Sequence, residues 1–283
     1  MGIPSTVSTE WLSEHNNDDA VRVVDASWHL PPTGIVGKDE YLKAHISGAV
    51  YFDIDACATP GDLPHTLPSA EKFAQYVGEL GIGNNHHVVV YDVSGWFSSA
   101  RVWWMFRHFG LSSVSVLDGG FAAWKENGFP IESGEADSTH AVFKATVSDD
   151  KRFQTVNSDQ VLAASKSGSA LIVDARPASR FDATDKEFRP GLRSGHIPNS
   201  RNVPFPELVN NGFLKSDTML KEIFEAAGFE SDVPVITSCG SGVTAAILTL
   251  ALEKIGGQNL SLYDGSWTEW GSLSHLPVEP SSD

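Results

Sequence analysis

Cys239 stands where an apolar stretch meets a glycine-rich turn, in the run Val235-Ile-Thr-Ser-Cys239-Gly-Ser-Gly-Val-Thr-Ala245. A strand over Val235–Ser238 would place the thiol at its carboxyl end, where ligands of parallel α/β sheets usually bind. The glycines allow several backbone N–H groups to turn inward, and the start of the following helix adds positive potential. Both effects favour a thiolate nucleophile, and both would hold the negative sulfur of a persulfide.

The alternative is that Cys239 is a small, buried and unreactive core residue. A comparison within the chain favours the reactive thiol. The similar apolar run Val88–Tyr91 ends at Asp92 and Val93-Ser94-Gly95-Trp96, a loop that cannot supply a thiolate. One half of the chain therefore has the features of a catalytic domain, and the other has those of a supporting domain.

Arginines are concentrated in the half that contains Cys239. Five of them fall within 26 residues: Arg176, Arg180, Arg189, Arg193 and Arg201. A solvated face or structural ion pairs would explain such a run, and so would a site for an anion. Charge alone leaves both interpretations open.

Composition excludes several classes of protein. The formal net charge of −16 argues against a nucleic acid or an anionic membrane as the main partner. The sequence contains no run of about 18 apolar residues, so no membrane span is predicted. Two cysteines in 283 residues rule out a disulfide scaffold or a four-cysteine zinc site. The N-terminal residues lack the pattern of a secretory signal, so we expect a cytoplasmic protein.

The strands and helices that would position these residues belong to an internal repeat. Val23-Val-Asp-Ala26 recurs as Ile172-Val-Asp-Ala175, and His45-Ile-Ser-Gly-Ala49 recurs as His196-Ile-Pro-Asn-Ser200. Leu117-Asp-Gly-Gly-Phe121 recurs as Tyr263-Asp-Gly-Ser-Trp267. Landmarks in one order at a nearly fixed offset indicate a duplicated domain, since the period is too long for a solenoid.

Each copy alternates short β-rich runs with helical stretches. In the second copy we predict buried parallel strands over Ala170–Asp174 and Val233–Ser238, and helices over Asp217–Gly228 and Thr244–Lys254. This order predicts an α/β fold with an open, mainly parallel sheet flanked by helices in each domain. We expect domains at 1–135 and 156–283, joined by a linker at 136–155 that overlaps the polar, Ser/Asp-rich stretch Ile131–Asp150.

From about Ser8 to Val278 the chain resembles the tandem rhodanese-domain sulfurtransferases. Tyr41–Ala49 is similar to the family's first signature, and Tyr263–Trp270 to its second. Arg101-Val-Trp-Trp-Met-Phe-Arg107 resembles a helix of the inactive first domain in these enzymes. The uncharged loop Cys-Gly-Ser-Gly-Val-Thr resembles that of the members that use 3-mercaptopyruvate, whereas thiosulfate-specific members carry basic residues after the cysteine.

The resemblance implies a role for each candidate residue. Cys239 would carry the sulfur as a persulfide, held by the loop residues Gly240, Gly242, Val243 and Thr244. Arg180 and Arg189 would bind the substrate carboxylate. Ser241 would form a proton relay with Asp55 and His65, which the non-catalytic first domain would contribute.

The implied reaction needs no metal and no organic cofactor. It would release pyruvate and pass the sulfur to a small thiol, to thioredoxin or to cyanide. Two alternatives stay open: a thiosulfate sulfurtransferase, and a non-enzymatic sulfur carrier or partner-binding module.

Other reactive residue types are expected to be bystanders. We interpret Cys57 as a packed thiol, and His45 and His196 as structural groups that bond nearby backbone. His86 and His87 are interpreted as a solvated turn, and Arg193 as surface charge. Phe97 stands where relatives often have tyrosine.

Overall fold

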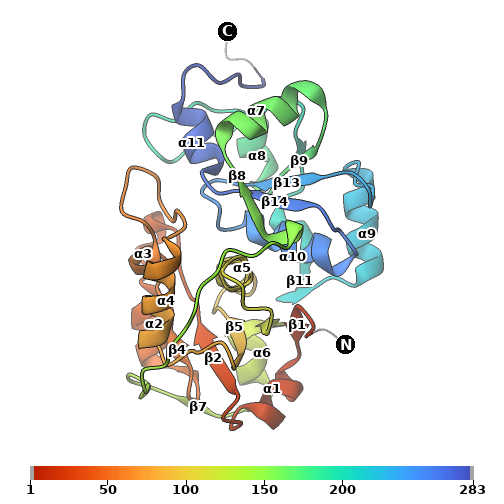
Figure 1. Ribbon diagram of the computed structural model, residues 1–283. Coiled ribbons are helices and arrows are strands. Elements are labelled where there is room, and N and C mark those ends of the chain that lie inside the picture. Colours follow the sequence, from red (N-terminus) through yellow and green to blue (C-terminus); the bar gives the residue numbers. More distant parts are fainter. Residues whose placement is uncertain (1–2, 281–283) are drawn as a thin grey trace. The chain divides into compact units, whose positions relative to one another are not determined.

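The computed structural model describes residues 3–280 and divides into two compact units (Figure 1). The first unit comprises the chain up to Thr59, Leu67–Ser148 and the short segment Val209–Leu214. The second comprises Pro60–Thr66, Asp149–Leu208 and the chain from Lys215 onward. No helix within the described residues is long and apolar enough to cross a membrane.

The first unit is built on a five-stranded sheet in the order β1-β6-β5-β2-β4, in which every neighbouring pair is parallel. Its strands are β1 (Thr6–Val7), β2 (Val21–Asp25), β4 (Val50–Tyr51), β5 (His87–Tyr91) and β6 (Val114–Leu117). Four of the five residues of β5 are buried, as expected for a central parallel strand covered on both faces.

The second unit repeats this topology with a sheet in the order β8-β14-β13-β9-β10, again parallel throughout. Its strands are β8 (Gln154–Val156), β9 (Leu171–Asp174), β10 (Arg201–Asn202), β13 (Val235–Ser238) and β14 (Leu260–Tyr263). The register is also repeated, because Asp25 pairs with Tyr91 in the first sheet and Asp174 pairs with Ser238 in the second. The predicted fold class, two α/β domains with parallel sheets, is confirmed.

Helices cover both faces of each sheet. Those of the first unit are α1 (Thr9–His15), α2 (Gly37–Lys43), α3 (Ile54–Cys57), α4 (Ala70–Glu79), α5 (Ser99–His108) and α6 (Gly120–Glu126). Those of the second are α7 (Ser158–Ser167), α8 (Ala178–Phe181), α9 (Asp217–Ala226), α10 (Ala245–Lys254) and α11 (Ser266–Ser272). Figure 1 shows α7 and α11 on one face of the second sheet, and α9 and α10 on the other.

Local sequence explains where these helices begin and how deep they lie. The Asn157 side chain accepts the N–H of Gln160 and the Gln160 side chain accepts the N–H of Asn157, a capping box that starts α7. In α10 the residues from Ala245 to Leu252 are all buried. Because that helix is apolar all round, it is a core helix rather than a surface one.

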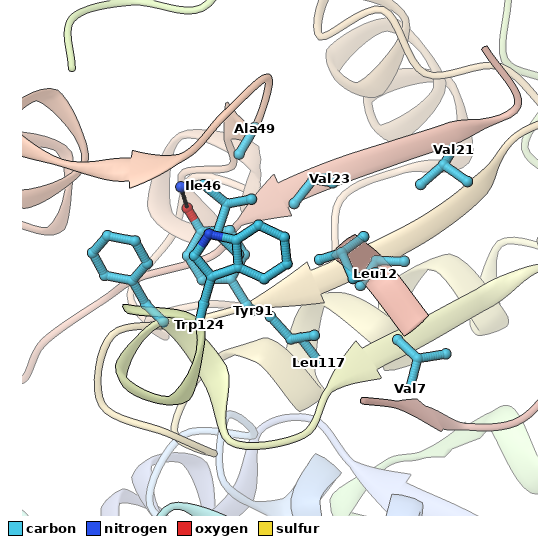
Figure 2. Packing of buried hydrophobic residues seen from close by; sticks show 11 residues of the cluster. Val7, Leu12, Val21, Val23, Ile46, Ala49, Tyr91, Leu117 and Trp124 are labelled. Carbon is cyan, nitrogen blue, oxygen red and sulfur yellow. Dashed lines mark hydrogen bonds between the residues drawn. The ribbon is translucent and has the colours of Figure 1, made fainter. Parts of the chain in front are cut away.

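Each unit has its own hydrophobic core. In the first, Leu12 of α1 and Trp124 of α6 pack against inward-facing strand residues that include Val23 and Tyr91 (Figure 2). The Tyr91 hydroxyl also accepts the backbone N–H of Ile46 at 3.1 Å. In the second, α7 and α11 pack on β9, β13 and β14 through a matching cluster: Val161, Ala164, Ile172, Ile197, Ile236, Tyr263, Trp267, Trp270 and Leu276.

A hairpin from late in the chain completes the first unit. Strands β11 (Val209–Asn210) and β12 (Phe213–Leu214) pair antiparallel, as do β3 (His45–Ile46) and β7 (Ile131–Glu132). The Leu214 N–H donates to Asp118 Oδ1 at 2.9 Å, and the same oxygen accepts the indole N–H of Trp96 at 3.2 Å. A Cβ on Gly119 would lie 2.6 Å from the Phe213 ring, so glycine permits this close packing.

Candidate active site

Cys239 directly follows β13, at the carboxyl end of the central strand of the second sheet. It is 1% exposed. Its backbone N–H donates to Ser266 Oγ at 3.1 Å, and that oxygen lies 4.0 Å from the Cys239 sulfur. The Ser266 hydroxyl donates to the Tyr263 carbonyl at 2.7 Å, while the Trp267 N–H donates to the Cys239 carbonyl at 3.0 Å. The start of α11 therefore fixes the thiol at its position.

Two arginines lie beside the loop that follows. A Cβ on Gly240 would be 3.4 Å from Nη2 of Arg180 and 3.8 Å from Nη1 of Arg189. The Gly240 carbonyl accepts both the N–H of Thr268, at 2.9 Å, and its hydroxyl, at 2.6 Å. Gly242 has a φ of +77°, in the left-handed region that glycine adopts without strain. The loop thus presents an uncharged backbone directly beside two guanidinium groups.

The other loop residues are mostly buried. Ser241 is 7% exposed and Val243 is 3% exposed. Thr244 is the N-cap residue of α10 and is half-buried. The second unit therefore brings together Cys239, both arginines and the whole uncharged loop.

Arg180 is the last member of a chain of ion pairs that begins at Asp174. Asp174 makes a bidentate pair with Arg176, whose Nη1 is 2.9 Å from Glu187 Oε1. The other oxygen of Glu187 lies 2.5 Å from Nη2 of Arg180. The Arg176 guanidinium also stacks over Trp267, 4.3 Å from the ring centroid. These contacts orient Arg180 toward the loop.

Arg189 has different partners. Its Nη1 donates to the hydroxyl of Thr268 at 3.4 Å, and its guanidinium lies 4.8 Å from the centroid of Phe188. Arg180 lies 4.9 Å from the same ring. Both guanidinium groups therefore contact the same aromatic ring, that of Phe188.

Arg193 is not surface charge, and that expectation was wrong. Its guanidinium donates to four backbone carbonyls at and beyond the end of α11: Trp270, Gly271, Leu273 and Leu276, at 2.7 to 3.1 Å. The Trp270 and Gly271 carbonyls lie in the last turn of the helix, where a cation is favoured. Arg193 holds the last helix in place.

Asp55 and His65, the two relay residues predicted in the first half, fall in different units. Asp55 lies on α3 in the first unit, and its Oδ2 accepts the indole N–H of Trp28 at 2.8 Å. Trp28 stacks on Phe97, with ring centroids 5.9 Å apart. His65 lies in Pro60–Thr66, the segment that groups with the second unit, and is buried with a φ of +60°.

The first copy holds a carboxylate where the second holds the thiol. Asp92 follows β5 and is 1% exposed. Its Oδ2 accepts the backbone N–H groups of Phe97, Ser98 and Ser99 at 3.0, 3.0 and 2.8 Å. The Asp92 side chain therefore accepts the backbone N–H groups at the start of α5 as an internal carboxylate.

Cys57 is the second thiol, and burial raises its pKa to about 12. It is fully buried on α3. A thiol with so high a pKa is almost entirely protonated at neutral pH, which supports the interpretation of a packed residue.

The histidines make structural contacts. Nδ1 of His45 lies 2.8 Å from the Tyr41 carbonyl, and Nδ1 of His196 lies 2.8 Å from the Phe181 carbonyl, as predicted. The expectation of a solvated turn at His86 and His87 was wrong. His86 is buried and its Nδ1 accepts the N–H of Gly83, whereas His87 begins β5 and contacts Ser115 on β6. Among residues 3–280, no three His, Cys, Asp or Glu side chains are grouped as a metal would require.

Comparison with known proteins defines the family. The model of the rhodanese-like domain matches residues 8–127 and 157–273, most of the chain and both copies. The chain belongs to the rhodanese family. The 3-mercaptopyruvate sulfurtransferase of Escherichia coli (strain K12) is 45% identical to this rhodanese over 278 residues, which cover 97% of each chain. The mitochondrial thiosulfate/3-mercaptopyruvate sulfurtransferase 1 of Arabidopsis thaliana is 40% identical, over 96% of this chain and 77% of the relative.

A solved structure gives the same result. The crystal structure of SseA from Escherichia coli, described as showing the rhodanese fold and catalytic mechanism of 3-mercaptopyruvate sulfotransferases, superposes on this rhodanese with a TM-score of 0.85. The sequence identity is 42%, over 93% of this chain and 99% of SseA. The predicted tandem rhodanese-domain sulfurtransferase is confirmed.

Several residues of this rhodanese site were missed from the sequence. Glu187, Ser266, Thr268 and Trp28 support the thiol loop, the arginines and Asp55. Ser266 and Thr268 lie within the second signature, which was the one available signal. Nothing in the local sequence of Glu187 or Trp28 indicates their partners.

Proposed function

We propose that this rhodanese-family enzyme transfers the sulfur of 3-mercaptopyruvate through a persulfide on Cys239 to an acceptor, releasing pyruvate. The observation that carries the proposal is the pair of guanidinium groups beside Gly240, next to a loop with no charged side chain. A guanidinium fork suits a single carboxylate at the end of a small substrate. The names of the relatives at 45% and 40% identity support the same donor.

The first half-reaction transfers sulfur to the enzyme. The Cys239 thiolate attacks the sulfur of 3-mercaptopyruvate, and a new S–S bond forms as the C–S bond breaks. The electron pair of that bond becomes the enolate of pyruvate, which takes up a proton at carbon and leaves. We assign the proton transfers to Ser241, His65 and Asp55 as a relay. The first domain would contribute Asp55 and carry no nucleophile of its own.

The second half-reaction returns the enzyme to its starting state. An acceptor attacks the outer sulfur and the Cys239 thiolate leaves, which completes a covalent ping-pong cycle. The loop amides from Gly240 to Thr244 would stabilise the persulfide anion between the two steps. Small thiols, reduced thioredoxin and cyanide are the acceptors we propose, and a cytoplasmic location stays a prediction.

Thiosulfate is the second candidate donor. The name of the Arabidopsis relative includes it, whereas the uncharged loop of this chain offers a dianion no extra cation. We therefore expect activity with both donors and a higher kcat/KM for 3-mercaptopyruvate.

Substitution of Cys239 tests the function directly. Purified Cys239→Ser should release no pyruvate from 3-mercaptopyruvate, whereas Cys57→Ser should release it at the wild-type rate. Mass spectrometry of the donor-treated wild-type protein, without acceptor, should find one added sulfur on the peptide that contains Cys239. Undiminished pyruvate release by Cys239→Ser, or a wild-type protein that takes up no sulfur, would refute the proposal.

A further inference from the structure

Glu187 joins the substrate arginine to the interior of the second unit. Its side chain is 1% exposed, and its two oxygens contact different cations. Oε1 is 2.9 Å from Nη1 of Arg176, and Oε2 is 2.5 Å from Nη2 of Arg180. Oε1 also accepts the Nε–H of Arg180 at 3.2 Å. Arg180 therefore shares its charge with a buried carboxylate before any substrate arrives.

Arg176 has other acceptors besides Glu187. Asp174 already accepts bonds from Nε and Nη2 of Arg176, and Nη2 also donates to the Gly195 carbonyl at 2.8 Å. Only Nη1 of Arg176 depends on Glu187. The remaining contacts of the Glu187 carboxylate are all with Arg180, the residue beside the thiol loop.

The ion-pair network is neutral by itself, and Arg189 beside it adds a single positive excess. Asp174 and Glu187 supply two carboxylates, and three arginines supply guanidinium groups: Arg176, Arg180 and Arg189. In a buried network the charges interact strongly, so the net value governs which anion is favoured beside Gly240. One net positive charge matches one carboxylate. A dianion such as thiosulfate would be left with a negative charge unmatched.

We propose that Glu187 is a specificity-determining residue, which favours a monoanionic donor over a dianionic one by neutralising part of the charge of Arg180. It also positions the Arg180 guanidinium, since its carboxylate accepts hydrogen bonds from both Nε and Nη2 of that group. This inference rests on the proposed function, because it takes Arg180 and Arg189 as the residues that bind the donor. It adds to the neutral loop a second determinant, which lies more than 50 residues earlier in the chain.

Glu187→Gln tests the proposal, because the glutamine amide has the shape of the carboxylate and keeps one of its oxygens but carries no charge. We expect the ratio of kcat/KM for thiosulfate to kcat/KM for 3-mercaptopyruvate to rise about tenfold, with cyanide as acceptor for both donors. Glu187→Asp keeps the charge and should return the ratio toward the wild-type value. Because both donors are measured on one sample, the ratio does not depend on the fraction of folded enzyme.

Glu253→Gln is the matched control. Glu253 pairs with Arg152 at 3.2 Å within the second unit, so the substitution makes the same change in net charge away from the loop. Its donor ratio should equal that of the wild type. An equal loss with both donors in Glu187→Gln, or a rise of the same size in Glu253→Gln, would overturn the specificity role.

A measurement on the wild-type enzyme keeps the test independent of any variant that fails to fold. Pyruvate, a monoanion, should inhibit competitively at a lower concentration than oxalate, a dianion of similar size. Equal or tighter inhibition by oxalate would contradict the charge argument. If instead the wild-type enzyme did not turn over 3-mercaptopyruvate at all, the proposed function would fail, and that result is separate from any change in ratio.

Discussion

Asp92 occupies in the first sheet the position that Cys239 occupies in the second. Each residue directly follows the central strand, one residue beyond the pairs Asp25–Tyr91 and Asp174–Ser238. In the first copy the carboxylate accepts three backbone N–H groups at the start of α5. The same strand–loop–helix geometry therefore holds a fixed internal anion in one domain and a nucleophile in the other.

Asp92→Ala should destabilise the protein. It removes the acceptor of three buried amide hydrogen bonds and the negative charge at a helix N-terminus, so we expect a loss of about 3 kcal/mol in the free energy of unfolding. Urea unfolding followed by fluorescence measures the loss. Asp19→Ala, at an exposed position, should change stability by less than about 0.5 kcal/mol. Equal stability of the two variants would show that Asp92 contributes nothing through these bonds.

Asp25 should make stability depend on pH. Burial raises the pKa of its carboxyl to about 6, and the nearby Asp92 carboxylate adds to the rise. Because the unfolded chain loses this proton near pH 4, the folded state alone keeps it between about pH 4 and 6. The stabilising contribution is therefore complete below pH 4 and is lost as the pH rises to 6, a change of up to about 3 kcal/mol.

Asp25→Asn removes this titration. The stability of Asp25→Asn relative to the wild type should increase between pH 4 and 6.5, as measured by urea unfolding across that range. The exposed substitution Asp19→Asn provides the reference curve. Parallel curves for Asp25→Asn and the wild type would mean that Asp25 titrates alike in the folded and unfolded chains.

Trp28→Phe tests whether Asp55 must be held in place. The substitution keeps a ring to stack on Phe97 but removes the indole N–H that Asp55 accepts. The loss of about 1 kcal/mol of orienting interaction should lower kcat/KM for 3-mercaptopyruvate about fivefold, with stability little changed. Phe97→Tyr, which keeps the stacked pair and the indole donor, serves as the comparison. Full activity of Trp28→Phe would show that Asp55 does not need the hydrogen bond from Trp28.

Arg193 and Arg189 should respond differently to substitution. Arg193→Met removes four bonds to backbone carbonyls and should lower stability by about 2 kcal/mol, while the KM for 3-mercaptopyruvate stays within twofold of the wild type. Arg189→Met should raise that KM at least about tenfold, because it removes a cation beside Gly240. Steady-state kinetics and thermal unfolding of both variants provide the readout. A raised KM in Arg193→Met would place that residue at the substrate as well.

Much of the fold was predictable from the sequence, because buried parallel strands leave continuous apolar runs. Val235–Ser238 is such a run, and the predicted strand differs from the observed one only at its first residues. The duplication was equally visible, since both copies keep the Asp that ends the second strand of each sheet. Cys239 and its glycine loop could be recognised for the same reason, because the chemistry depends on residues adjacent in sequence.

What the sequence did not reveal depends on contacts between distant segments. Glu187 lies in an irregular stretch, and its partners are fixed by how that stretch folds back on Arg176 and Arg180. Trp28 and Asp55 are 27 residues apart, and Trp28 lies outside any helix or strand. His87 looked like part of a polar turn because its pairing with Val21 of β2 and its side-chain contact with Ser115 of β6 depend on distant strands rather than on its own neighbours in sequence.

The hairpin at Val209–Leu214 restricts how the chain can be divided. It is counted in the first unit although the chain on both sides of it belongs to the second. A fragment that begins at the second copy would carry the hairpin without Asp118 and Gly119, and would expose the edge of Phe213 that packs on Gly119. Cleavage of the polypeptide in the linker would likewise leave the hairpin, which comes from the second half of the chain, packed in the first unit. The two copies are thus repeats by descent but are not modules that can be exchanged or expressed separately at the repeat boundary.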